Sequence, residues 1–226
     1  MSEMSLLPLV LSGKLALVTT VILVVLAAPL AYVLHYARFR GKSLLEALVN
    51  LPLVLPPTVL GFYLLILMGP KGAAGRFWEW LTRTSLVFSF QGIVFASIIC
   101  SLPFAFQPMK TAFSKIDKRL IESAYVLGLS RISTFFRVVL PNSIGGIAAA
   151  AILVFIHTIG EFGVILMVGG SIPGKTKVVS IAIYEAVEAL HYREAGIMSL
   201  SLLPVCYAVL IFANLISERK SHGALR

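Results

Sequence analysis

Long runs of apolar residues separated by polar segments dominate the chain. Five such runs are found, and each exceeds the roughly 18 residues that a membrane-crossing helix needs. They cover approximately residues 15–37, 44–68, 86–107, 143–168 and 197–217. The sequence lacks the alternating apolar and polar positions of barrel strands, so we expect helices, which satisfy their own backbone hydrogen bonds in lipid. The pattern therefore predicts an all-α polytopic membrane protein with about five transmembrane helices.

The composition strengthens this prediction. Of the 226 residues, 58% are hydrophobic and 13% are charged, whereas a soluble domain is about 45–50% apolar and about 25% charged. We therefore expect one transmembrane domain over residues 1–226. A secretory signal peptide is the alternative for the first run, which contains Ala27-Ala28-Pro29 as a possible cleavage region. The run is longer than the ~7–15-residue apolar core of a signal peptide, which favours a span.

Lysine and arginine are unequally divided between the two sides of the predicted membrane. Twelve of them lie in segments 38–43, 108–141 and 218–226, and seven lie in segments 1–14, 69–85 and 170–195. Because cytoplasmic loops of membrane proteins collect Lys and Arg, we expect the N-terminus outside and the C-terminus in the cytoplasm. Topology thus explains the net charge of +9, and no nucleic-acid partner is expected.

The cytoplasmic loop 108–141 is too long and too strongly patterned for a simple connector. Asp117 is placed to cap a helix that ends near Gly128. Ser130 is placed to cap a second helix, which we expect Pro141 to end.

An apolar stripe follows the first of these two helices. It consists of Leu120, Ile121, Ala124 and Leu127. One interpretation is that the stripe covers the chain's own spans or the lipid headgroups. The other is that it inserts into a groove of a cytoplasmic partner.

The same loop resembles the EAA loop of ABC-importer permeases. The resemblance rests on Glu122-Ser123-Ala124, on Gly128, and on Val138, Leu140 and Pro141. The family pattern has Ala at the second and Ile at the fifth of these positions, and both differences preserve size and spacing. The resemblance implies a type I importer permease fold and a coupling loop that docks on a separate ATPase. The residues that carry this implied role are Glu122, Ser123, Ala124, Gly128, Leu140 and Pro141.

Further segments are similar to molybdate-type oxyanion permeases, namely residues 51–57, Gly61, 160–163 and 172–176. The resemblance implies a permease subunit that moves molybdate into the cytoplasm of a bacterial or archaeal cell by alternating access, across its inner membrane. It implies as partners a second copy of the chain, a cytoplasmic ABC ATPase dimer and an external substrate-binding protein. Permeases for sulfate, thiosulfate or tungstate are alternatives within this family. A channel or a secondary transporter is an alternative outside it.

Residues 169–176 match the phosphate-binding pattern G-x-x-x-x-G-K-[ST], but we do not expect ATP to bind there. The match follows a predicted span on the external side, and the chain's one aspartate, Asp117, is not on a strand where it would hold Mg²⁺. No nucleophile–base arrangement for catalysis is evident. We therefore expect no enzymatic activity, no cofactor and no metal on this chain, with ATP hydrolysed by the partner ATPase.

The second predicted span contains one candidate for the translocation pathway. Pro56 and Pro57, with Pro52 one turn earlier, must distort a helix because each removes a backbone donor. Thr58 beside them offers a hydroxyl to a passing oxyanion. The alternative is a kink that only shapes helix packing.

The fourth predicted span contains the second candidate. Glu161 is an ionisable residue within an apolar run, and His157 one turn earlier is expected to share its helical face and to hydrogen-bond with it. Gly160 and Gly163 permit close helix approach or a local break. The family resemblance leads us to expect a basic residue, usually Arg, at the His157 position. The alternative is a structural polar pair that locks helix packing.

Overall fold

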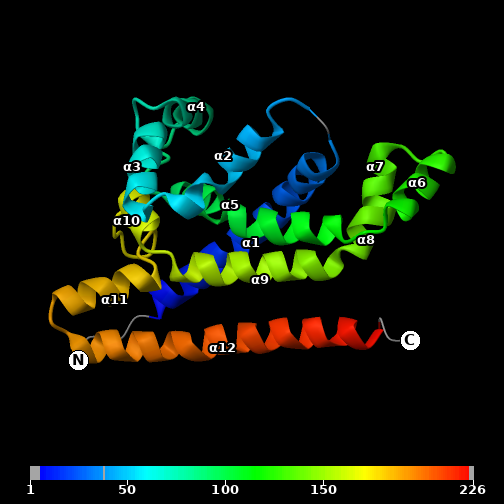
Figure 1. Cartoon of the computed structure of the whole chain (residues 1–226). Coiled ribbons are helices and arrows are strands. Elements are labelled where there is room, and N and C mark those ends of the chain that lie inside the picture. The colour runs from blue at the N-terminus through cyan, green and yellow to red at the C-terminus, as the bar shows by residue number, and fades with distance from the viewer. Residues whose placement is uncertain (1–5, 38, 224–226) are drawn as a thin grey trace.

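A computed structural model describes residues 6–37 and 39–223, with side chains up to residue 211. All regular secondary structure in these residues is helical, which confirms the predicted all-α class (Figure 1). The elements are α1 (Leu7–Tyr36), α2 (Lys42–Val54), α3 (Pro57–Met68), α4 (Ala73–Thr82), α5 (Phe90–Ser114), α6 (Lys118–Val126), α7 (Arg131–Thr134), the π-helix η1 (Phe135–Val139), α8 (Leu140–Asn142), α9 (Ile144–Gly160), α10 (Gly163–Gly169), α11 (Val179–Glu188) and α12 (Tyr192–Gly223).

Helices α1, α5 and α9 form the centre of the molecule and lie side by side (Figure 1). Their shared core contains Leu23 of α1, Phe106 of α5 and Val154 of α9, all fully buried. Small residues on α1, such as Ala27 and Ala31, are also fully buried, and small side chains let helix backbones approach closely in a membrane. The first apolar run is therefore an integral part of the core.

Three to five helical segments of the described residues suit a membrane crossing. Helices α1 and α5 and the first 20 residues of α12 are each long and apolar enough to cross alone. Two bent pairs bring the number to five if each pair is one span. In one pair α2 and α3 meet at 115°, and in the other Arg131–Asn142 and α9 meet at 76°.

Helices α1 and α5 each extend beyond the apolar run from which they were predicted. Helix α1 begins at Leu7 rather than near residue 15, with Pro8 in its first turn, where the missing N–H costs no hydrogen bond. Helix α5 continues beyond residue 107 to Ser114, and Pro108 does not end it. This extension buries Met109 and Phe113 completely in the central core, which offsets the donor lost at the proline.

The fourth apolar run, 143–168, is not one helix. It breaks after α9 at Glu161, whose backbone is extended, and resumes as α10, which packs against α3 and α5. The Glu161 carboxylate accepts a hydrogen bond from the Val164 N–H at 3.1 Å and so satisfies the first turn of α10. The local break that Gly160 and Gly163 permit is therefore present.

The two ends of the helical core carry different elements (Figure 1). Helices α6 and α7 lie at one end, on the side toward which α12 runs, and α11 lies at the other end, near the start of α1. Residues 39–43 and the end of segment 108–141 that carries α6 and α7 thus lie toward the same end of the molecule.

Candidate functional site

The loop segment, defined here as residues 117–143, begins its two helices at the residues that the sequence predicts. The Asp117 carboxylate accepts a hydrogen bond from the Arg119 N–H at 2.9 Å and caps α6. The Ser130 hydroxyl oxygen accepts one from the Ser133 N–H at 3.2 Å and caps α7. Both capping predictions are confirmed.

Gly128 ends α6 in the left-handed conformation, with φ of +81°. The Gly128 N–H donates to the carbonyl of Tyr125 at 2.9 Å, and the Leu129 N–H donates to that of Ala124 at 3.0 Å. This pair of bonds is the Schellman ending, which favours glycine because it has no Cβ. The turn leaves Glu122 and Ser123 exposed on α6.

The predicted apolar stripe divides into two parts. Ile121 and Ala124 are buried on the chain's own core, whereas Leu127 is 79% exposed and Leu120 is 49% exposed. Val126, the neighbour of Leu127 in the chain, is 87% exposed, and Ile132 of α7, which lines a groove toward α1, is 73% exposed. One side of the loop segment therefore covers the protein, and the other presents an apolar surface.

The second helix of the segment does not end before Pro141, contrary to our expectation. Residues 135–139 form a π-helix in which the Leu140 N–H donates to the carbonyl of Phe135, and helical structure continues to Asn142. The wider π turn accommodates the proline ring and its missing donor. Leu140 packs half-buried against the core, and Pro141 is exposed.

Tyr32 of α1 fastens the loop segment to the core, and Tyr36 one turn later joins α1 to α5. Sequence reasoning missed both tyrosines. The Tyr36 hydroxyl donates to the carbonyl of Phe113 at 3.0 Å, and the Tyr32 hydroxyl donates to that of Arg131 at 3.4 Å. The Tyr32 ring also lies 4.9 Å from that of Phe135. Their spacing of one helical turn near the end of α1 is a signal, since interfacial tyrosines anchor membrane helices.

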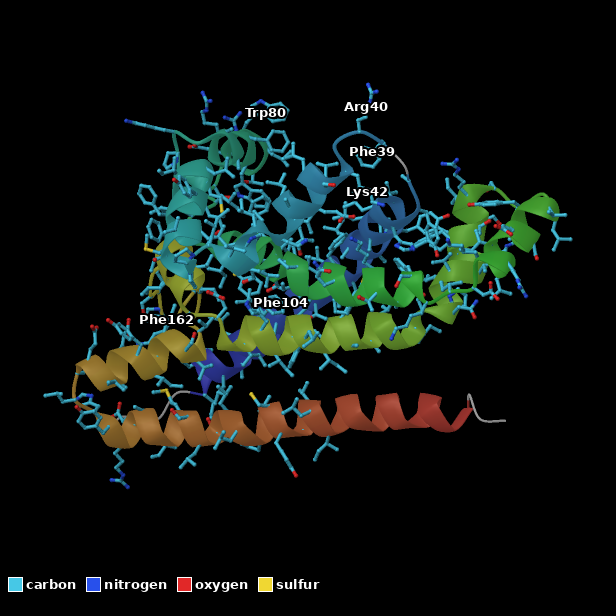
Figure 2. The ribbon with its side chains drawn as sticks, in the orientation of Figure 1. Phe39, Arg40, Lys42, Trp80, Phe104 and Phe162 are labelled. Atoms are coloured by element: carbon cyan, nitrogen blue, oxygen red, sulfur yellow. The ribbon has the colours of Figure 1, made fainter. Side chains whose placement is uncertain are left out.

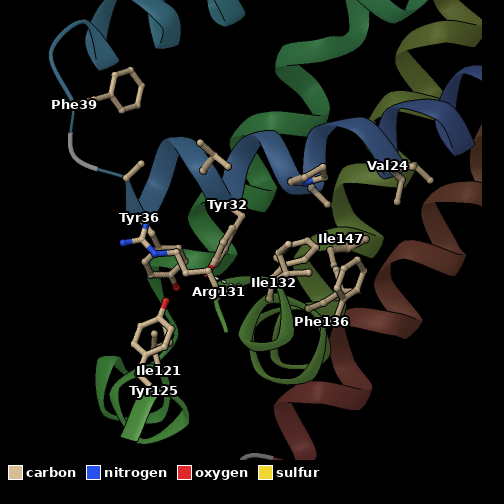
Figure 3. A pocket seen from close by; sticks show the side chains of 17 residues that line it. Val24, Tyr32, Tyr36, Phe39, Ile121, Tyr125, Arg131, Ile132, Phe136 and Ile147 are labelled. Carbon is tan, nitrogen blue, oxygen red and sulfur yellow. Dashed lines mark hydrogen bonds between the residues drawn. The ribbon is translucent and has the colours of Figure 1, made fainter. Parts of the chain in front are cut away.

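A groove of about 1150 Å³ separates α1 from the loop segment (Figure 3). Tyr36, Tyr125 and Arg131 gather at one end of it, and Val24 and Ile147 lie toward the other. The loop segment is thus held at defined points rather than packed along its whole length.

The proline break in the second span is confirmed between α2 and α3. Leu55 and Pro56 have extended backbone, and Pro57 occupies the first turn of α3, where it is tolerated. Pro52 stays within the last turn of α2. Thr58 is exposed beside the break.

The two breaks lie against each other, although they are far apart in the sequence. The first turn of α10 rests on the first turn of α3, with Gly163 against Pro57. One turn further, a Cβ on Gly61 would lie 2.8 Å from the Cβ of Met167, so only glycine fits without displacement. Both candidate pathway elements therefore belong to one contact.

Glu161 and His157 share a helical face as predicted, but their atoms Oε2 and Nε2 lie 3.7 Å apart, too far for the expected hydrogen bond. Two residues of α5 that sequence reasoning did not connect with them complete a polar cluster. The Cys100 thiol donates to Oε2 of Glu161 at 3.5 Å, and the Ser101 hydroxyl oxygen lies 3.0 Å from Nδ1 of His157. The Phe104 ring stacks on the imidazole at 4.0 Å, from the neighbouring helix (Figure 2). Gly160 lies beside the cluster with open space at its Cβ position.

Residues 169–176, which match a phosphate-binding pattern, form a turn that is held by hydrogen bonds within the segment. Thr176, whose hydroxyl would hold Mg²⁺ in a phosphate loop, is fully buried and donates to the carbonyl of Gly169 at 2.8 Å. Its oxygen also accepts from the Ile172 N–H at 3.0 Å. The match precedes α11 without any strand before it in the described residues. The pattern therefore forms a structural turn.

An ion pair fastens this turn to α11. Nζ of Lys177 lies 2.5 Å from Oε2 of Glu185. Burial raises the pKa of the Glu185 carboxyl, but the hydrogen bond and the charge of Lys177 outweigh burial and lower the pKa below its ordinary value of 4.5.

The sequence matches known proteins over almost its whole length. Residues 23–222 match the family described as "Binding-protein-dependent transport system inner membrane component". The chain is 44% identical over 225 residues to the molybdenum transport system permease protein ModB of Azotobacter vinelandii, covering 100% of this chain and 99% of that protein. It is 33% identical to the putative molybdenum transport system permease protein YvgM of Bacillus subtilis, covering 95% and 93%.

A sulfate-related protein is also similar, over less of its length. The chain is 34% identical to the probable sulfate transport system permease protein cysT of Zygnema circumcarinatum, covering 95% of this chain and 76% of that protein.

Solved structures share the fold. One is a bacterial ABC transporter involved in the import of alginate, with a TM-score of 0.73 and 20% identity, covering 97% of this chain and 80% of that chain. Another is a bacterial alginate ABC transporter in complex with a pentasaccharide-bound periplasmic protein, with a TM-score of 0.77 and 19% identity, covering 96% and 80%.

Proposed function

Because the chain belongs to the family of binding-protein-dependent transport system inner membrane components, we propose that it is the membrane-spanning permease subunit of an ATP-driven importer of molybdate. The observation that carries the choice of anion is the full-length likeness to a molybdenum permease. Sulfate is the second candidate. It has less support, because the sulfate-related protein is less similar and is longer than the aligned region.

The loop segment is the part that we assign to energy coupling. Glu122 and Ser123 are exposed on α6, Gly128 fixes the turn after it, and Leu127 and Ile132 present apolar surface. An exposed amphipathic helix of this kind suits insertion into a groove of a cytoplasmic ATPase. ATP would then be bound and hydrolysed by that ATPase dimer. Ala124, Leu140 and Pro141 of this chain belong to the coupling segment and take no part in ATP hydrolysis.

The attachment of the loop segment to α1 gives a route by which motion of the ATPase would reach the membrane helices. Closure of the ATPase pair would move α6 and α7, and the hydrogen bond of Tyr32 to Arg131 would pass that motion to α1, which the Tyr36 hydrogen bond joins to α5. Rigid helices that pivot together convert such a motion into alternating access. The contact of Pro57 with Gly163 lies toward the opposite end of the core, and we assign the gate to it. Pro56, Thr58, His157, Gly160 and Glu161 surround this region.

The surroundings of the chain are part of the proposal. We place the loop segment and the end of α12 in the cytoplasm and the start of α1 outside, because the Lys- and Arg-rich segments gather at the loop-segment end. A second copy of the chain would complete the pathway at the subunit interface. An external binding protein would deliver the anion, as a periplasmic protein accompanies one structural neighbour.

Reconstitution of the complete complex in liposomes tests the proposal. The binding protein is loaded in turn with molybdate, tungstate or sulfate, and the empty binding protein is the control. Stimulation of ATP hydrolysis and uptake by molybdate and tungstate but not by sulfate is the expected result. A preference for sulfate would overturn the choice of anion and retain the coupling mechanism. Uptake without the ATPase would overturn the mechanism.

A further inference from the structure

Three metal-binding side chains from two helices converge at the break after α9. Sγ of Cys100, a ring nitrogen of His157 and a carboxylate oxygen of Glu161 lie within 4.8 Å of one another. Cys100 and Glu161 are buried, and the His157 side chain is 24% exposed. Thiol, imidazole and carboxylate are together the donor set that zinc uses in proteins.

The second polar atom of His157 and that of Glu161 each bond a neighbouring group. Ser101 bonds Nδ1 of His157, which leaves Nε2 facing Glu161. The Val164 N–H bonds Oε1 of Glu161, which leaves Oε2 facing Cys100. Phe104 stacks on the imidazole and restricts its plane. A partner on the second nitrogen of a ligating histidine is the usual outer-shell arrangement of metal sites.

We propose that Cys100, His157 and Glu161 form a binding site for a thiophilic divalent cation, with Zn²⁺ as the best fit. Bonds of about 2.3 Å to sulfur and about 2.0–2.2 Å to nitrogen and oxygen give ligand separations of roughly 3.3–3.6 Å in a tetrahedron. Two of the three observed separations are close to this range, at 3.5 Å from Sγ to Oε2 and 3.7 Å from Nε2 to Oε2, and the third, from Sγ to the imidazole nitrogen, is within 4.8 Å. Three protein ligands leave the fourth position for water.

Charge balance favours such an ion. Among the described residues, His157 is the only basic group within 4.0 Å of the Glu161 carboxylate. A buried carboxylate without a full countercharge is costly in a membrane segment. When the ion binds, the Cys100 thiol loses its proton to solvent, and the two negative ligands then balance the two positive charges of the metal.

The bound ion would tie α5 to the end of α9 and, through the Val164 hydrogen bond, to the start of α10. Metal binding itself does not depend on the proposed transport function. If that function holds, the ion clamps the break beside the proposed gate, and saturating Zn²⁺ slows anion uptake.

A cobalt titration of the purified complex tests the site, because Co²⁺ takes the same ligands and a cobalt–thiolate bond absorbs in the near ultraviolet. We expect one Co²⁺ per chain, a charge-transfer band and its loss on adding Zn²⁺. Cys100→Ser should abolish the band, whereas Cys206→Ser on α12 should leave it unchanged. Ser101→Ala should weaken binding by about 10–100-fold, as removal of an outer-shell partner does.

Absence of the band in the unaltered chain would overturn the proposal without reference to any variant. A band that survives Cys100→Ser would overturn it as well. The melting temperature of each variant without metal checks that a lost band reflects a lost ligand rather than unfolding. Failure of transport with metal binding intact would count against the proposed function alone.

Discussion

The Cβ of Pro57 lies 3.0 Å from the position that a Cβ would take on Gly163. The proline ring is rigid, so Pro57 has little freedom to move away from a side chain placed at position 163. This contact joins two interruptions in separate apolar runs, one between α2 and α3 and one between α9 and α10.

Replacement of Gly163 tests this contact. Gly163→Val places a branched side chain against Pro57, and we expect the free energy of unfolding to fall by about 1–3 kcal/mol, as in other overpacked sites. Gly160→Val is the matched control, because a Cβ there meets nothing within 4 Å. Its stability should stay within about 0.5 kcal/mol of the unaltered chain. Chemical denaturation in detergent measures both, and equal losses would contradict the contact.

Replacement of Gly128 tests the turn of the loop segment. The left-handed backbone at φ of +81° disfavours a branched residue by about 1–2 kcal/mol, so Gly128→Val should displace α7 relative to α6. We expect ATP hydrolysis by the complex to persist while uptake per ATP falls. Gly128→Asn should retain more coupling, since Asn tolerates this conformation. Normal uptake by the Val variant would refute the coupling role.

Charge reversal at Glu122 tests docking without altering the fold. Glu122 is exposed on α6, so Glu122→Lys should change the unfolding free energy by less than about 0.5 kcal/mol. We expect the affinity for the ATPase subunit to decrease. Glu79→Lys, which is exposed on α4 away from the loop segment, is the control and should bind normally. Affinity in detergent is measured directly, and an equal affinity of both variants for the ATPase would count against docking at α6.

The Lys177–Glu185 ion pair predicts a pH dependence at the turn before α11. The Glu185 pKa is lower in the folded chain than its ordinary 4.5, so the stabilisation is present above that value and is lost as the pH falls through the folded pKa. The carboxylate is partly exposed, so the effect should stay below about 1 kcal/mol. The protection factors of residues 170–178 against hydrogen exchange, which are corrected for the intrinsic pH dependence of exchange, should fall at low pH, and Glu185→Gln should remove this fall. Protection factors that still fall at low pH in the Gln variant would assign the effect elsewhere.

Local chemistry explains why several predictions agree with the structure. Asp117 and Ser130 cap helices through hydrogen bonds that span two or three residues, and Gly128 ends one through its own backbone angle. Such interactions can be predicted from residues that are close together in the sequence. The extension of α5 past Pro108 could not be predicted in this way, because it depends on the burial of Met109 and Phe113 against α1.

The sequence by itself determined the all-helical membrane class, the two-helix loop segment and the interruption at Pro56 and Pro57, and it permitted an interruption at Gly160 and Gly163 without deciding it. These features depend on hydrophobicity, donor loss and backbone freedom at single positions. Only the tertiary structure decided that the two interruptions touch, that Tyr32 holds the loop segment, and that Cys100 faces Glu161 across helices. The physical reason is that packing between α1, α5, α9 and α10 sets those distances, and no periodicity within one helix encodes its neighbour.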